Sequence, residues 1–132
     1  MFNSGTIYSN FTPLVKAPVI GYRLSGDDVL NILKKITKKN FSKDHSFIRI
    51  VKIYQKDESI LDECSVVYFK SPKSFTGEDV CEIFLHGSPL IASQFEQLLK
   101  DLKFPGLRLA KNGKRSIKFF LRLGYLPGII KV

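Results

Sequence analysis

Two neighbouring segments rich in β-branched and aromatic residues constrain the fold of this 132-residue chain most. They span residues 46–54 (SFIRIVKIY) and about 61–69 (LDECSVVYF), and a turn at residues 56–59 separates them. Residue types of this kind favour strands, and a short turn between two strands favours a β-hairpin. The predicted hairpin means that strands and helices do not alternate strictly along the chain.

The other segments predict further strands and about three helices. Strands are predicted over residues 6–11, 18–24, 79–85 and 107–110. A first helix is predicted over 26–39 with Ser25 as its N-cap, and lysines fill its last turns. A second begins at Ser88 and ends before Pro105, and a short third covers 116–123. The expected fold class is α+β, with a mixed β-sheet and about three helices.

Composition excludes several classes of protein. Hydrophobic residues make up 44% of the chain and charged residues 25%, which is typical of a globular domain. No apolar run approaches the roughly 18–20 residues that cross a bilayer, and the N-terminus lacks a signal-peptide pattern. Two cysteines, Cys64 and Cys81, are too few for a disulfide framework. These features predict a cytoplasmic protein with free thiols and no membrane partner.

The net charge of +9 is unevenly placed along the sequence. After Asp101 there is no acidic residue, whereas eight lysines and arginines follow it. A second basic group consists of Lys34, Lys35, Lys38, Lys39 and Lys43. Such groups can bind RNA, phosphates or another anionic ligand, and they are equally typical of a solvated lysine-rich surface.

Residues 74–89 (SFTGEDVCEIFLHGSP) combine acids, a thiol and a histidine. A metal site at Glu82 and His86 would need further converging ligands. A Cys81–His86 nucleophile would need an activated thiolate, but in a strand Cys81 points away from Glu82 and is expected to be buried. Glu82 could instead accept two parallel hydrogen bonds from an amidine-like edge, or form a surface ion pair. No Walker A loop is present, because Arg108 stands at the position of its first glycine and Arg115 at the position of its Ser/Thr.

The same stretch resembles the N-terminal domain of the tRNA-modification GTPase family called MnmE or TrmE. That family's pattern is S-F-T-G-E-D-V-x-E-x-x-x-H-G-G-P, and this chain departs from it only at Ser88. Residues 21–26 (GYRLSG) resemble the family's G-[IL]-x-R-[IL]-S-G, and residues 104–110 (FPGLRLA) resemble its P-G-L-R-x-A segment. The likeness assigns residues 1–123 to a folate-binding and dimerisation domain and leaves 124–132 as a divergent tail.

The resemblance implies a domain similar to the folate domain of the glycine-cleavage T protein. It implies a homodimer that binds 5-formyl-tetrahydrofolate or a related reduced folate, with the family's arginine at Arg23 and its glutamate at Glu82. The position of the family's lysine holds Gly124, and loop glycines are replaced by Val15 and Ala17, which would weaken folate binding. No catalytic or metal-binding residue is carried over.

Full-length members of that family add a helical domain and a G domain, and act with MnmG on the wobble uridine of certain tRNAs. This chain has no GTP-binding signature, so we expect a truncated or stand-alone module that is not catalytic alone. The alternative is a degenerate interaction module that has lost folate binding and pairs with full-length MnmE or with MnmG. Direct tRNA binding through the acid-free C-terminal third is a further possibility.

Overall fold

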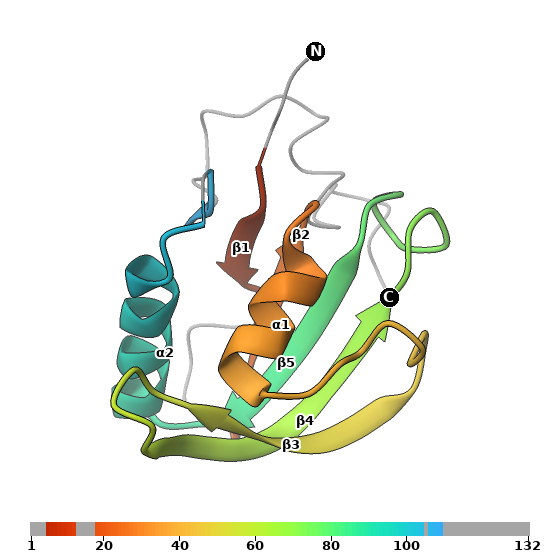
Figure 1. The fold of residues 1–132 in the computed structure, drawn as a ribbon. Coiled ribbons are helices and arrows are strands. Elements are labelled where there is room, and N and C mark those ends of the chain that lie inside the picture. Colours follow the sequence, from red (N-terminus) through yellow and green to blue (C-terminus); the bar gives the residue numbers. More distant parts are fainter. Residues whose placement is uncertain (1–4, 13–17, 105, 110–132) are drawn as a thin grey trace.

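A computed structural model of the protein describes residues 5–12, 18–104 and 106–109. Their six strands and two helices are shown in Figure 1. In chain order these are β1 (Ile7–Asn10), β2 (Val19–Ser25), α1 (Val29–Thr37), β3 (Ile48–Tyr54), β4 (Ile60–Phe69), β5 (Val80–His86), α2 (Pro89–Asp101) and β6 (Arg108–Leu109). The predicted α+β class is confirmed.

The strands form one mixed sheet in the order β3-β4-β5-β2-β1-β6. The pairs are antiparallel except β1 with β6, which is parallel. The predicted hairpin is confirmed as β3 and β4, in which Val51 lies opposite Cys64. At the centre of the sheet, β2 and β5 pair from Val19–His86 to Ser25–Val80. This pairing joins segments that are far apart in the sequence.

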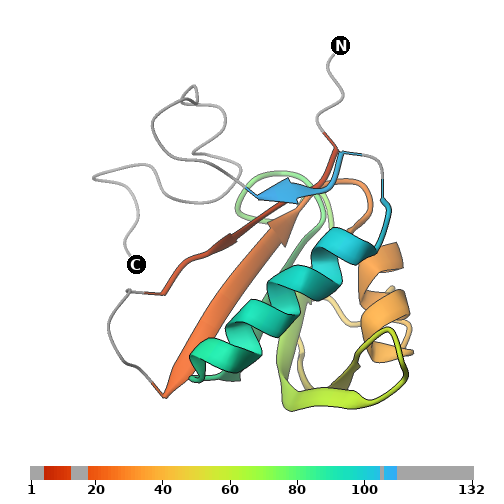
Figure 2. The same cartoon turned by 90° about the vertical axis from the view of Figure 1, so that its left-hand side faces the viewer.

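Both described helices pack on the same face of the sheet (Figures 1 and 2). The buried side of α1 is formed by Val29, Ile32, Leu33 and Ile36. On α2, Phe95 packs against Tyr22 of β2, with 4.9 Å between ring centroids. Because side chains alternate along a strand, every second residue of β2 and β5 points away from this core. We call that opposite side of the sheet the open face.

The predicted start of the first helix is wrong. Ser25 is the last residue of β2 and is buried, and α1 begins only at Val29. Between them Gly26 has φ +148°, and a Cβ there would lie 2.5 Å from the Cα of Thr6. The hydroxyl of Thr6 accepts a hydrogen bond from the backbone N–H of Asp28 at 2.9 Å. Because the backbone passes so close to Thr6, the helix begins later than Ser25 would place it. The Thr6 hydroxyl, from another segment, binds the N–H at the helix start in place of a capping side chain.

The predicted start of the second helix is confirmed. The Ser88 hydroxyl accepts a hydrogen bond from the N–H of Ile91 at 3.3 Å, and Pro89 is the first helical residue. The helix ends at Asp101, earlier than predicted, and Lys103 has a left-handed φ of 58°. The expected number of helices, about three, differs from the two in the described residues, because residues 116–123 lie outside them, as do Gly124 and the tail. None of the described helices has the length and apolar character needed to cross a membrane.

Candidate functional site

The structure brings Arg23 and Glu82 together at the middle of the open face. They lie directly opposite each other in the β2–β5 pairing. One oxygen of Glu82, Oε2, accepts hydrogen bonds from Nη2 of Arg23 at 2.7 Å and from Nε at 3.0 Å. The side chains are 15% and 20% exposed, so the ion pair is partly buried and still reachable from solvent. Such a charge-assisted pair is stronger than a fully exposed one.

The second carboxylate oxygen of Glu82, Oε1, receives no hydrogen bond from the part of the chain that the structure describes. An ionised carboxylate offers about four acceptor positions, and Arg23 occupies those of Oε2. The pair therefore presents a fixed negative oxygen that can accept N–H donors from a ligand. Arg23 holds the orientation of that oxygen and balances its charge.

Aromatic rings flank the guanidinium of Arg23. Its central carbon lies 4.5 Å from the ring centroid of Phe11 and 5.7 Å from that of Phe75. Phe11 also meets Phe84 edge-on, with 5.8 Å between centroids. Gly21 leaves room for Phe11, because a Cβ at Gly21 would lie 2.6 Å from that ring. The sequence interpretation missed these rings, although Phe84 is two residues after Glu82 and therefore on the same face.

The turn that precedes β5 is fixed to the end of β2. The Ser25 hydroxyl is hydrogen-bonded to Oγ1 of Thr76 and to Oε2 of Glu78, both at 2.9 Å. Gly77 has a left-handed φ of 84°, and its N–H donates to Oγ of Ser74 at 3.0 Å. These contacts fix the turn and hold Phe75 beside Arg23. Thr76 and Glu78 thus support the site by fixing the turn to the end of β2.

The thiol in this stretch faces the helices. Cys81 is fully buried on the side of the sheet opposite to Glu82 and His86, so a Cys81–His86 pair is excluded. Burial raises the pKa of the Cys81 thiol well above its usual range, and the charge of Glu82 acts in the same direction. Burial likewise raises the pKa of Cys64 to about 12. Both thiols are therefore kept in their protonated form, as small apolar groups.

The histidine of the stretch is bound to an acid on the neighbouring strand. Nδ1 of His86 lies 2.9 Å from Oδ1 of Asp62, and the backbone N–H of His86 donates to Oδ2 of Asp62 at 2.9 Å. Glu82 is engaged with Arg23 instead, so the structure does not join Glu82 and His86 in a metal site. Within the described residues no three His, Cys, Asp or Glu side chains converge as metal ligands would.

The open face continues from the ion pair to the edge of the sheet. The strand register places Arg23, Glu82, Val67 and Ile48 in one row across four strands. The next row contains Gly21, Phe84, Ser65 and Ile50. Ile48 is 71% exposed and Ile50 is 65% exposed. Two exposed isoleucines therefore lie in the same rows as the ion pair and Phe84, and the buried Val67 lies between Ile48 and Glu82.

An open cavity of about 300 Å³ lies toward the Val19–His86 end of the β2–β5 pairing, and its lining includes Ile50, Ser65 and Phe84. A second cavity, of about 240 Å³, lies near the end of α1. Its lining includes Thr37, Lys39, Lys52 and Tyr54. Neither cavity is lined by Arg23 or Glu82, which lie on the sheet surface itself.

Comparison with known proteins finds a family and a set of relatives. The family model described as "GTP-binding protein TrmE N-terminus" matches residues 6–122. A tRNA modification GTPase MnmE of Helicobacter pylori is 45% identical over 88% of this chain and 24% of its own length. Proteins of the same name from Rickettsia bellii and Campylobacter concisus are 38% and 41% identical, over 88% and 75% of this chain. The Rickettsia and Campylobacter matches cover 26% and 22% of those proteins, so the chain spans about a quarter of the relatives' length.

Proposed function

The chain belongs to the family of TrmE N-terminal domains, and on that premise we propose that it binds a reduced folate through Arg23 and Glu82 and associates as a homodimer. Its place is in the modification of tRNA, the activity named for its relatives. The ligand class is a one-carbon folate such as 5-formyl-tetrahydrofolate. The proposal for this chain is limited to binding and association, because the matched relatives are about four times as long.

The observation that supports the ligand most strongly is the Glu82 carboxylate. Arg23 orients it through two bonds to Oε2, and Oε1 accepts no hydrogen bond from the described residues, so it can receive an incoming donor. A pterin ring carries an N–H and an exocyclic amine along one edge, which suits a carboxylate acceptor of this kind. Phe11 and Phe75 add flat apolar surfaces beside the charge. A charge-assisted hydrogen bond of this type contributes about 1.5–3 kcal/mol.

Isothermal titration with 5-formyl-tetrahydrofolate tests the ligand. Glu82→Gln keeps the shape of the side chain and removes its charge, and we expect at least about tenfold weaker binding, from about 1.4 kcal/mol or more of lost interaction. Glu63→Gln is the matched control, because Glu63 lies on β4 on the same face of the sheet as Glu82 but does not contact Arg23. Absence of heat at millimolar ligand, or equal affinity of the Glu82 variant and the original chain, would refute folate binding.

The exposed apolar side chains of the open face support the homodimer. Ile48 and Ile50 are each at least 65% exposed, and exposed apolar surface of this kind is typical of protein interfaces. The charged residues of this face occur as opposite pairs, Arg23 with Glu82 and Lys52 across from Glu63. Two copies could therefore pack their open faces together without net repulsion.

A further inference from the structure

Positive charge gathers at one end of the described domain. Residues 34–56 contain a single acid, Asp44, against eight basic residues: Lys34, Lys35, Lys38, Lys39, Lys43, Arg49, Lys52 and Lys56. The other described residues carry eleven acids against six basic residues, which are Arg23, Lys70, Lys73, Lys100, Lys103 and Arg108. The basic end comprises the last turn of α1, the loop that follows it and the edge strand β3. A segregated charge of this kind attracts polyanions.

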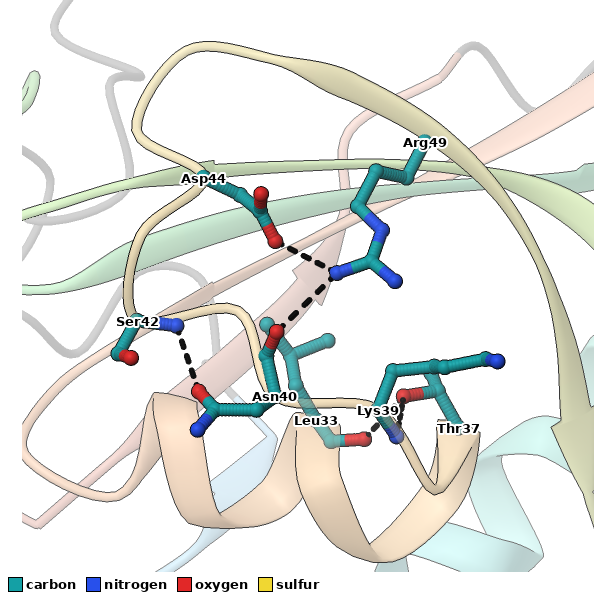
Figure 3. A network of polar contacts seen from close by, with 7 residues as sticks. All are labelled: Leu33, Thr37, Lys39, Asn40, Ser42, Asp44 and Arg49. Atoms are coloured by element: carbon teal, nitrogen blue, oxygen red, sulfur yellow. Dashed lines mark hydrogen bonds and ion pairs between the residues drawn. The ribbon is translucent and has the colours of Figure 1, made fainter.

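A network of polar contacts fixes the loop after α1 (Figure 3). Nη1 of Arg49 donates to Oδ2 of Asp44 at 2.5 Å and to the carbonyl oxygen of Asn40 at 3.1 Å. The Arg49 guanidinium also lies 4.6 Å from the ring centroid of Phe41, which is buried. The N–H of Ser42 donates to the Asn40 side chain at 2.8 Å. Arg49 is thus occupied in holding the loop, which presents its lysines from a fixed backbone.

Most lysines of this end have no acidic partner. Lys38 is the exception, because it pairs with Glu58 and lies 4.2 Å from the ring centroid of Tyr54. Six exposed lysines of this end make no ion pair with any described residue: Lys34, Lys35, Lys39, Lys43, Lys52 and Lys56. We call these six residues the basic surface. Of them, Lys39 and Lys52 line the 240 Å³ cavity, so a phosphate group bound there would lie next to both residues.

We propose that the basic surface binds the phosphate backbone of RNA, with tRNA as the ligand. The choice of tRNA rests on the proposed role in tRNA modification, whereas the basic surface itself follows from charge and contacts alone. Lysines are point-charge donors that suit phosphates whatever the base sequence. A favourable interaction with the helix dipole accounts for lysines in the last turn of α1, but not for Lys43 in the loop beyond it.

An exposed aromatic ring favours RNA over an acidic protein. Phe47 is 65% exposed and lies directly before β3, close in sequence to Lys43 in the preceding loop. Rings beside a basic groove stack on unpaired bases, and this contact adds to the charge attraction. An acidic protein segment would use the lysines equally well but would gain nothing specific from stacking. Apart from Lys52, which lies across from Glu63 on the open face, the basic surface is separate from the open face, whose charges are balanced.

Fluorescence anisotropy with a labelled, unmodified tRNA transcript tests the proposal on the full chain between about 50 and 200 mM salt. The variant Lys35→Gln/Lys39→Gln/Lys43→Gln removes three charges from the basic surface. We expect at least tenfold weaker binding and a salt slope shallower by about 2–3, since each phosphate contact contributes about 0.7–0.9. The control Lys70→Gln/Lys100→Gln/Lys103→Gln removes the same charge elsewhere from exposed positions, and we expect less than a twofold change.

Three results would overturn the proposal. They are no binding of tRNA at the lowest salt, an equal loss in both triple variants, and tighter binding of poly-glutamate or of phosphatidylglycerol vesicles than of tRNA. The same basic-surface variant is also titrated with 5-formyl-tetrahydrofolate. Unchanged folate binding together with lost tRNA binding supports the two sites as separate, and absence of folate binding in all variants would refute only the folate proposal.

Discussion

Neighbouring residues of β2 place different polar pairs on the two faces of the sheet. Arg23 meets Glu82 on the open face, whereas Tyr22 donates from its hydroxyl to Oε2 of Glu96 at 2.5 Å beneath α2. Burial raises the pKa of Tyr22 well above its usual value of 10.0, and the hydrogen bond to Glu96 and its charge raise it further. Tyr22 therefore stays a neutral donor in the folded protein, and folding disfavours its ionisation.

Tyr22→Phe should reduce the rate at which the free energy of unfolding falls as the pH rises above 10. An unfolded tyrosine releases its proton near pH 10, while folded Tyr22 retains it, so its contribution is fully present below pH 10 and declines as pH rises above it. Each pH unit above 10 removes up to about 1.4 kcal/mol through this residue. Urea unfolding at pH 9, 10 and 11 measures the slope for both proteins. Equal slopes would show that Tyr22 does not titrate differently in the two states.

The sequence predicts a helix or strand correctly where residues close in sequence determine it. The hairpin, the alternation of β5 and the Ser88 cap were all predictable, because each depends on residues close in sequence. The start of α1 was not, because Ser25 is taken by Thr76 and Glu78, and Gly26 by the nearby Thr6. The preference of serine for the N-cap position contributes little free energy compared with such tertiary contacts.

Gly26→Ala should be clearly more destabilising than Gly77→Ala. Both glycines have positive φ, +148° and +84°, so an alanine is strained at either. At Gly77 a Cβ would meet no atom within 4 Å, whereas at Gly26 it would lie 2.5 Å from the backbone of Thr6. We expect about 1–2 kcal/mol for the strain alone at Gly77 and a larger loss at Gly26. Urea unfolding of both variants measures the difference, and equal losses would contradict the close approach.

In the homodimer that we propose, the open face is the surface through which two copies associate. Its exposed isoleucines, Ile48 and Ile50, lie in the same rows as the ion pair and Phe84. Ile48→Ser/Ile50→Ser should convert the proposed homodimer into a monomer, because it removes apolar area that only association buries. Light scattering after size exclusion measures the mass. Leu90→Ser is the control, since Leu90 is also 65% exposed but belongs to α2 on the other face. A dimer that survives the isoleucine changes, or a monomeric original chain, would refute this interface.

The candidate site was predictable only in part. Arg23 and Glu82 were found through family motifs, and their direct pairing needed the strand register, which local patterns do not specify across so long a separation. Phe11 and Phe75 were missed for the same reason, because they approach Arg23 from other segments. The basic group at the end of α1 was visible in the sequence, but the network that holds its loop was not.

The pairing of β2 with β5 also sets the order of events during synthesis on the ribosome. Arg23 precedes Glu82 by 59 residues, a gap that takes about 3–12 s to translate at about 5–20 residues per second. During that interval the nascent chain has made β2 but lacks the strand that closes the middle of the sheet. The hairpin β3–β4 can form first as a local unit, and β5 then joins it to the waiting N-terminal strands. The arginine and its carboxylate thus meet only when β5 joins the two parts of the sheet.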